Sequence, residues 1–385
     1  MTAAAKPGPL AGLTVVEMAG IGPVPLAGLM LSEFGASVVR VERMDAGRPF
    51  LVVSAEYDLD RHGRDVLKLD LKRSEGIDLL LRLVDKADIL IEGYRPGVME
   101  RLGLGPDIAL ARNPALIYGR MTGFGQDGPL SRRAGHDLTY LAYSGILHAI
   151  GPKGGKPVPP LNLVADYGGG TMFLVTGVLA ALVERGRSGL GQVVDATMID
   201  GASMLAAPTF AFLAAGFWKD ARGANLLDSG APFYDTYQTA DGGHVAVACL
   251  EPRFFAEFAR LLPLDARFAG AQYDESLWDD MRAAIATRIV SRTRDEWAAL
   301  FEQTDACVAP VLSLEEAPRH PHNQARGTHR PLGAMQRPAP APRLSRTPAA
   351  LSTATTTRDA AEVLAGFGID ATEAASLAKA GIVGE

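Results

Sequence analysis

The sequence predicts an α/β protein with a large open-sheet domain and a smaller α+β domain. Strand-like and helix-like segments alternate over the first third of the chain, which is typical of an open α/β sheet. A polar, Gly-rich passage at residues 222–230 indicates a boundary, and two strand-like segments around Asp241-Gly242-Gly243 indicate a hairpin. The length of 385 residues fits two domains, because single domains cluster near about 100–150 residues.

The first part of the sheet is predicted from runs of apolar, β-branched residues. The expected strands are residues 14–18, 37–41, 66–69, 88–91 and 115–118. A helix is expected at 26–34, and a second one carries the apolar stripe Ile77, Leu80, Leu81 and Val84. Sheets of this kind bind ligands at the carboxyl ends of their strands.

A long apolar stretch follows Asp166. Helices are expected at 172–183 and 193–218, joined by a basic turn at 185–187. The eighteen residues 201–218 carry no charge and approach the length of a membrane-spanning helix, but Pro208 and neighbouring hydroxyl side chains interrupt them. We therefore expect a buried or subunit-interface helix and no membrane association.

The second domain is expected to contain the hairpin strands 234–240 and 244–249, followed mainly by helices. Thr293 and Glu296 have the spacing of a helix capping box. Recurring prolines in residues 330–348 predict an extended linker with little regular structure, and the tail should be helical. The predicted division is a large domain at 1–190, a helical linker at 191–224, a small α+β domain at 225–328, and a linker with return to the large domain at 329–385.

Composition restricts the class of function. The chain is 48% hydrophobic and 21% charged, which favours a compact fold over disorder. Its formal charge of −6 comes with no basic run, which argues against nucleic-acid binding and favours a small-molecule role. The two cysteines, Cys249 and Cys307, have no disulfide or zinc spacing, and no apolar leader follows Lys6, so we expect a cytoplasmic location.

Two kinds of residue suggest a nucleotide at the strand ends. Gly20-Ile21-Gly22 with Glu42 outlines a dinucleotide fingerprint, but Pro25 holds the third glycine position, so a structural turn is the better interpretation. Cations near strand ends suit phosphates, although surface cations are commonly only solvated. These cations are Arg40, Arg43, Lys72, Arg73, Arg95 and Arg101.

Three residues could carry chemistry, each with a structural alternative. His136 lies in a Gly-bounded segment and is either a proton carrier or a core histidine. Asp166 is a natural helix N-cap, but the glycines at 168–170 suggest close approach of a ligand. Glu251 precedes Pro252, where it favours a helix N-terminus. The pair His320 and His322 lacks a third ligand, so no metal site is expected.

Read together, longer motifs resemble the superfamily of family III CoA-transferases and α-methylacyl-CoA racemases over nearly the whole chain. The motifs are residues 10–20, 35–42, 92–97, 101–103, 121–126, 135–137, 166–170 and 191–195. Family transferases use the carboxylate at the Asp166 position as a nucleophile. The racemase branch adds a histidine, here His136, and an acid, here Glu251; residues 225–232 also resemble that branch.

The resemblance implies a 1,1-proton transfer at carbon 2 of a 2-methylacyl-CoA thioester, with no metal or redox cofactor. One of His136 and Asp166 would remove the α-proton and the other would return it, with N–H groups at the Asp166 helix start stabilising the enolate and Glu251 tuning His136. CoA transfer through an Asp166 anhydride is the alternative. The implied coenzyme A contacts are Arg43, Leu69, Asp70, Leu71, Lys72, Gly93, Tyr94, Arg95, Arg101, Gly135, Asp137 and Tyr140.

The family resemblance also implies an interlocked homodimer with the active site between the large domain of one subunit and the small domain of its partner. Glu251 would then act across subunits, and residues 201–218 would be covered by the partner. Relatives line the acyl path with methionines, whereas Phe210, Phe212 and Phe217 stand in the corresponding stretch here. The acyl preference therefore stays open.

Overall fold

The computed structural model describes residues 8–44, 53–354 and 358–384. The chain divides into two compact units. The first unit contains residues 8–144, 161–205 and 327–384, and the second contains 145–160 and 206–326. This division places residues 145–160 in the second unit and 191–205 in the first, whereas the sequence-based division placed them in the large domain and the linker.

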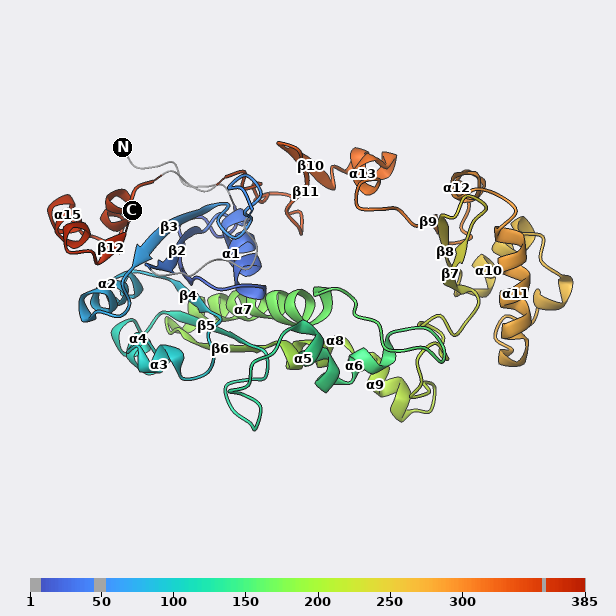
Figure 1. Ribbon diagram of the computed structural model, residues 1–385, viewed down its shortest axis with the longest axis horizontal. Coiled ribbons are helices and arrows are strands. Elements are labelled where there is room, and N and C mark those ends of the chain that lie inside the picture. Colours follow the sequence, from blue (N-terminus) through green and yellow to red (C-terminus); the bar gives the residue numbers. More distant parts are fainter. Residues whose placement is uncertain (1–7, 45–52, 355–357, 385) are drawn as a thin grey trace. The chain divides into compact units, whose positions relative to one another are not determined.

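The first unit is built on a seven-stranded sheet in the order β12-β3-β2-β1-β4-β5-β6 (Figure 1). Its parallel strands are β1 (Thr14–Met18), β2 (Ser37–Arg43), β3 (Arg64–Leu69), β4 (Ile89–Glu92), β5 (Ile117–Thr122) and β6 (Gln192–Thr197). The short β12 (Val383–Gly384) pairs antiparallel to β3. The strand order reverses between β1 and β4, which is where doubly wound sheets bind ligands. The predicted α/β class is confirmed.

Helices cover both faces of this sheet. On one face, α1 (Pro23–Glu33) and α7 (Met172–Ser188) pack against each other and against the strands (Figure 1). The other face forms an apolar core in which Val16 and Met18 of β1 meet α2 and the C-terminal helices. The helices of this second face are α2 (Ser74–Val84), α4 (Pro106–Arg112), α14 (Ala360–Ala365) and α15 (Ala371–Lys379).

Several short elements follow the carboxyl ends of the strands. They are α3 (Val98–Arg101), α5 (Asp137–Ser144), the π-helix η1 (Leu163–Thr171) and α8 (Met198–Leu205). The π-helix packs against α1, α5 and α8 and continues into α7. These elements carry most of the candidate site residues.

Several secondary-structure predictions were wrong. The expected turn at residues 185–187 lies within α7, which extends to Ser188. Residues 193–197 belong to β6 and not to a helix, because Val193 and Val194 pair with Tyr118 and Gly119 at the edge of the sheet. The segment 330–348 is not structureless either, since β10 (His329–Leu332) and β11 (Met335–Pro338) form a hairpin. The expected helical tail is confirmed by α14 and α15.

The second unit has its own apolar core beneath a three-stranded antiparallel sheet. Strands β7 (Tyr234–Gln238), β8 (His244–Ala248) and β9 (Val308–Pro310) pack with α10 (Pro252–Leu261), α11 (Trp278–Ile289) and α12 (Arg294–Phe301). The predicted hairpin is confirmed by β7 and β8, and the capping box of Thr293 and Glu296 is present at α12. Shorter elements are α6 (Ile146–Ala149), α9 (Ala207–Ala214), η2 (Ala266–Phe268), η3 (Glu275–Leu277), η4 (Ala317–Arg319) and α13 (Pro321–Arg326).

The apolar segment 201–218 is not one helix. It divides into the end of α8 and the exposed helix α9, where Phe210 and Phe212 are half exposed. By length and composition, the helical run Leu163–Ser188 could cross a membrane. That is weak evidence, since core helices meet the same criterion and α7 packs along β5 and β6.

Candidate active site

Asp166 lies inside the π-helix and does not cap it, so the predicted N-cap role is wrong. The π-helix is capped by the side chain of Asp137, whose Oδ2 accepts the backbone N–H groups of Ala165 and Asp166 at 2.8 Å each. π-Helical turns are rare and concentrate at functional sites. The side chain of Asp166 is thereby free of a local backbone role.

The glycines after Asp166 serve helix packing. A Cβ atom on Gly169 would lie 2.5 Å from the backbone nitrogen of Ala202 and 2.8 Å from the carbonyl oxygen of Met198. A Cβ atom on Gly170 would lie 3.0–3.1 Å from Met198 and Pro23 side chains. The interpretation that these glycines admit a ligand is therefore wrong for Gly169 and Gly170, which are buried against α8 and α1; for the partly exposed Gly168 it stays a prediction.

The carboxyl group of Asp166 is half buried beside the turn after β1. Its Oδ2 lies 3.5 Å from where a Cβ atom on Gly22 would stand, and it accepts a hydrogen bond of 3.3 Å from Asn162. Burial is the main cause that raises the pKa of Asp166, and the negative charge of Asp137 raises it further; the Asn162 hydrogen bond and the charge of His136 lower it. A carboxyl group with a raised pKa can both give and take a proton.

His136 is exposed, which excludes the core-histidine alternative. It stands directly before α5, where its N–H donates to Oγ1 of Thr139 at 3.0 Å and its carbonyl oxygen accepts the Thr139 N–H at 2.8 Å. These bonds fix the backbone and leave the imidazole available. His136 and Asp166 are 30 positions apart in sequence, yet they lie close enough for the charge of one to affect the pKa of the other.

Tyr140 connects this pair to the turn after β4. Its buried ring packs against Gly123 and Gly135 and lies edge-on to Phe124, with ring centroids 4.9 Å apart. Burial raises the pKa of Tyr140 to about 12, with a further contribution from the charge of Asp166, while Arg95 lowers it. The phenol therefore lies within electrostatic reach of both Asp166 and Arg95.

The turn after β4 is held by a buried carboxyl group that the sequence motifs did not single out as functional. Glu92 accepts the N–H of Tyr94 at 2.7 Å and the Arg120 guanidinium at 3.1 Å. Burial raises its pKa to about 7. This arrangement leaves Gly93 and Arg95 exposed at the sheet edge.

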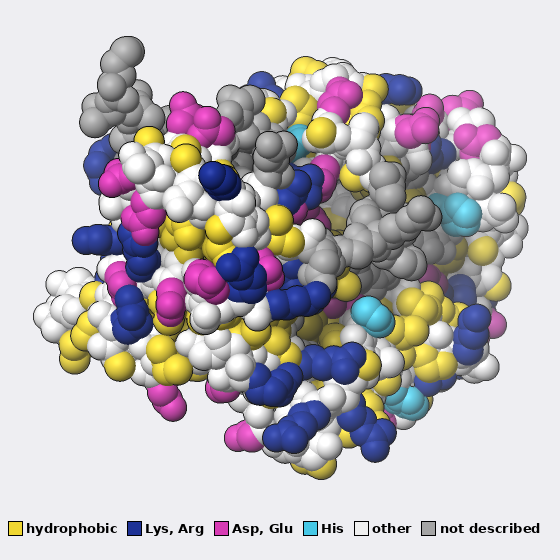
Figure 2. Space-filling model, turned by 60° about the vertical axis from the view of Figure 1, so that its left-hand side comes forward, with side chains coloured by type: hydrophobic (Ala, Val, Ile, Leu, Met, Phe, Trp, Pro, Cys, Tyr) yellow, Lys and Arg dark blue, Asp and Glu magenta, His cyan; other side chains and the backbone are white. Residues whose placement is uncertain are grey.

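The remaining expected coenzyme A contacts differ in exposure. Arg43, Lys72 and Arg101 are exposed, and the positive charge of Arg43 acts on Tyr94. Leu69 and Leu71 are buried in the core, so only their backbones can meet a ligand. Asp70 is half buried and accepts the Lys72 N–H at 3.0 Å. Figure 2 shows a face on which Lys and Arg side chains form several groups, some with acidic side chains between them.

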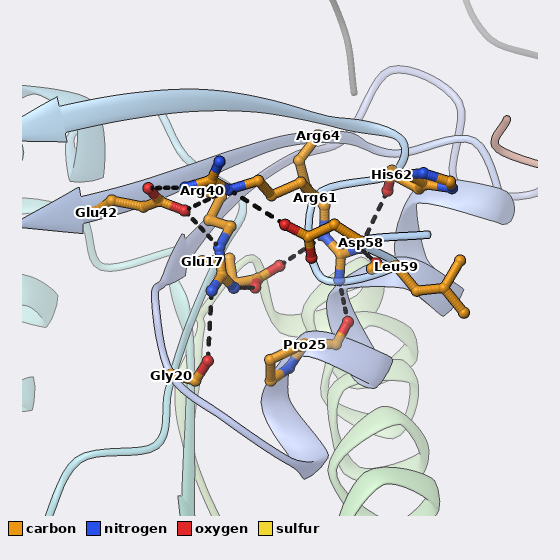
Figure 3. Close-up of polar contacts among 10 residues, drawn as sticks. All are labelled: Glu17, Gly20, Pro25, Arg40, Glu42, Asp58, Leu59, Arg61, His62 and Arg64. Atoms are coloured by element: carbon orange, nitrogen blue, oxygen red, sulfur yellow. Dashed lines mark hydrogen bonds and ion pairs between the residues drawn. The ribbon is translucent and has the colours of Figure 1, made fainter. Parts of the chain in front are cut away.

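Arg40 is not available to a phosphate. It is buried and bonded to Glu17, to Glu42 at 3.2 Å and to the carbonyl oxygen of Gly20 at 3.3 Å (Figure 3). Arg64 also bonds to Glu17, at 3.0 Å, and donates to the carbonyl oxygen of Pro25. This buried network anchors the turn between β1 and α1, which carries Gly22 next to Asp166.

Glu251 belongs to the second unit, so the three catalytic candidates are divided between the units. It precedes α10 and is exposed, and its side chain makes no capping hydrogen bond. Its negative charge contributes to the raised pKa values of Tyr273 and Cys307. Among the described residues, no group of three His, Cys, Asp or Glu side chains is arranged to hold a metal ion.

The fold and these motifs define a protein of the CoA-transferase family III, and the chain belongs to that family: its family model matches residues 10–361. The alpha-methylacyl-CoA racemases of Mus musculus and Homo sapiens are 46% and 43% identical to it, over 88% of this chain and 87% of theirs. The succinyl-CoA–L-malate CoA-transferase alpha subunit of Chloroflexus aurantiacus is 31% identical over 88% of this chain and 84% of its own. The crystal structure of a CaiB/BaiF family protein from Brucella suis has a TM-score of 0.79 at 28% identity and covers 95% of this chain and 100% of its own.

Proposed function

We propose that this protein racemises 2-methylacyl-CoA thioesters by moving one proton at carbon 2. The observation that carries the proposal is the pairing of an exposed imidazole, His136, with a half-buried carboxyl group, Asp166, in the first unit. The similarity to two racemases at 43–46% identity supports the same reaction.

In the proposed mechanism, one of the two groups removes the α-proton and the other delivers a proton to the opposite face of the planar enolate. Inversion requires two groups because each reaches one face only. A histidine titrates near neutral pH, and the raised pKa of Asp166 brings its carboxyl group closer to that range. The two residues can therefore exchange acid and base roles between the two directions of the reaction.

The enolate oxygen needs a hydrogen-bond donor, and the expected donor must be revised. The N–H groups of Ala165 and Asp166 are occupied by Asp137. Helix α5 begins beside His136, and its first N–H groups, those of Asp137 and Leu138, have no helical acceptor. We propose that these N–H groups stabilise the enolate, an effect worth about 2.7–4 kcal/mol per donor in comparable sites.

The coenzyme A part is proposed to bind along the exposed strand ends of the first unit. Arg43, Lys72, Arg95 and Arg101 supply cations, and bidentate guanidinium contacts suit phosphate groups. Glu251 is proposed to tune His136 from the partner subunit of a homodimer that also covers the exposed α9. Because only a proton moves, the proposed reaction needs neither a metal nor a redox cofactor.

The test is hydrogen exchange in deuterium oxide. A single-enantiomer 2-methylacyl-CoA should incorporate deuterium at carbon 2 and lose optical purity with wild-type enzyme. His136→Ala should reduce exchange by about 10²–10⁴-fold, the usual contribution of a general acid or base. His244→Ala, which removes an exposed histidine from β8, is the matched control and should retain full exchange. Retained configuration without exchange by wild-type enzyme would rule out the proposal.

CoA transfer between carboxylic acids is the second candidate, because the Chloroflexus aurantiacus transferase subunit is also similar. That reaction would make Asp166 a nucleophile that carries the acyl group as an anhydride. Hydroxylamine would then trap an acyl group on Asp166 during turnover, which racemisation does not predict. Screening acyl acceptors in the same assay separates the two reactions.

A further inference from the structure

Asp137 is a carboxylate with an unusual place in the first unit. It is only 5% exposed, and it starts α5 directly after His136. Its Oδ2 bonds to two backbone N–H groups of a different element, 28 and 29 positions later in the sequence. Its Oδ1 is buried and has no hydrogen-bond partner among the described residues. Such a group is costly to bury, which indicates that its contacts matter.

The two N–H groups lie in the turn that carries Asp166. A π-helix bonds residue i to i+5, so its first turn has more unpaired N–H groups than an α-helix has. A local N-cap would satisfy one of them and could not tie η1 to α5. Asp137 is the residue directly after His136, and its carboxylate binds the backbone N–H of Asp166. The bond therefore links the backbone at His136 to the backbone at Asp166.

The same carboxylate also acts through its charge. It is among the causes that raise the pKa of Asp166, whereas His136 lowers that pKa. Tyr140 of α5 also lies within electrostatic reach of Asp166. The other helices packed on η1 carry their charges elsewhere: Glu33 of α1 pairs with Arg337, the charges of α7 lie in its last turns, and Asp200 of α8 acts on Asp195.

We propose that Asp137 is a positioning residue of this active site, which clamps the first turn of the π-helix to α5 and so holds the carboxyl group of Asp166 beside His136. The inference rests on the proposed racemisation for its catalytic consequence, but the effect of the Asp137 charge on Asp166 can be measured without turnover. In this proposal the side chain of Asp137 binds protein backbone, so only the backbone of Asp137 can contact the thioester.

The first experiment compares Asp137→Asn with wild type in pH profiles of kcat/KM for both directions of racemisation. Asparagine keeps an acceptor oxygen for both N–H groups but removes the charge. In each profile, the limb that reports the ionisation of Asp166 should move to lower pH. This is the ascending limb for the direction in which Asp166 acts as the base, and the descending limb for the direction in which it acts as the acid. Asp88→Asn is the matched control, because Asp88 accepts the Thr14 N–H at 2.9 Å from the opposite end of the strands. It should leave both limbs in place.

A second variant separates geometry from charge. Asp137→Ala removes the acceptor as well, and it should lower kcat by about 10²-fold with little change in KM, since misplacement of a catalytic group by about 1 Å costs that much. Asp137→Asn should recover most of this loss near its own pH optimum. Equal losses in KM and kcat for Asp137→Ala, or failure of Asn to restore activity, would contradict a positioning role.

The third measurement does not depend on turnover. Carbon NMR of aspartate-labelled protein, with the Asp166 resonance assigned through Asp166→Asn, reports the Asp166 titration directly. The titration should move to lower pH in Asp137→Asn and stay unchanged in Asp88→Asn. An unmoved titration in Asp137→Asn overturns the inference even if racemisation is confirmed. A moved titration in a protein that exchanges no α-hydrogen supports the placement of the Asp137 carboxylate beside Asp166 and refutes the proposed function.

Discussion

The contact between η1 and α8 predicts opposite effects for the same substitution at two helical glycines. A Cβ atom on Gly201 would lie 1.9 Å from the carbonyl oxygen of Gly169 and 2.7 Å from its carbonyl carbon. Both atoms are backbone, so a helix must move to make room. By contrast, Gly186 is exposed in α7, and a Cβ atom there would meet nothing within 4 Å.

The magnitudes follow from two opposing effects. Alanine in place of glycine inside a helix stabilises by about 0.5–1 kcal/mol, because the unfolded chain loses conformational freedom. Overpacking costs about 1–3 kcal/mol when surrounding atoms must shift. Gly186→Ala should therefore raise the unfolding free energy by about 0.5–1 kcal/mol. Gly201→Ala should lower it by about 1–2 kcal/mol.

The assay must report on the first unit alone. The three tryptophans, Trp218, Trp278 and Trp297, all lie in the second unit. Their fluorescence therefore reports unfolding of the second unit and not of the first. Hydrogen exchange of peptides from residues 163–205, measured across a urea series, follows η1 and α8 directly. Gly201→Ala should also reduce racemisation, because Gly169 belongs to the same π-helix as Asp166. A stabilising effect at Gly201 equal to that at Gly186 would refute the close contact.

Two further predictions concern buried carboxyl groups. Because the pKa of Glu92 rises from 4.5 to about 7 in the folded protein, its contribution to stability is present below pH 4.5 and is lost as pH rises through about 7. Urea unfolding of Glu92→Gln should therefore show stability relative to wild type increasing by about 3 kcal/mol between pH 4.5 and 8; a pH-independent difference would contradict this. Arg64→Met leaves Glu17 buried with one cation fewer, so it should cost about 3–5 kcal/mol at neutral pH. The cost should shrink in acid, where Glu17 can be protonated, and a constant cost would show that lost packing dominates.

The sequence predicted those elements that are short continuous apolar runs or that carry an apolar stripe. Strands β1, β2 and β4 are runs buried on both faces of the sheet, and α2 has the apolar stripe of an amphipathic helix. Strand β6 was missed because its first residues are exposed at the sheet edge and its apolar sequence runs directly into α8. Pairing with β5 decides its conformation, and pairing is not visible in a single segment.

The candidate site was predicted in part, through motifs, but its supporting groups were not. His136 and Asp166 could be named from the family resemblance, and the structure brings them within electrostatic reach. The π-helix could not be foreseen, because it depends on Asp137 and on the glycine contact with α8. The partners of Glu17 likewise depend on the register of three adjacent strands.

Three buried carboxyl groups each fix the backbone of a loop at the candidate site. Glu17, through Arg40 and Arg64, holds the turn after β1; Glu92 holds the turn after β4; and Asp137 holds the start of η1. The oxygens of Glu17 and Glu92 bind arginines or a backbone N–H group, and Asp137 uses Oδ2 for two backbone N–H groups while its Oδ1 is buried. All three carboxyl groups are thereby enclosed by the protein. Exposed side chains such as Arg95 and His136 therefore stand on backbone segments that buried carboxyl groups hold in place. An acidic residue near the site can therefore support the backbone without taking part in the reaction. Of the carboxyl groups discussed in the first unit, Asp166 is the best suited to proton transfer.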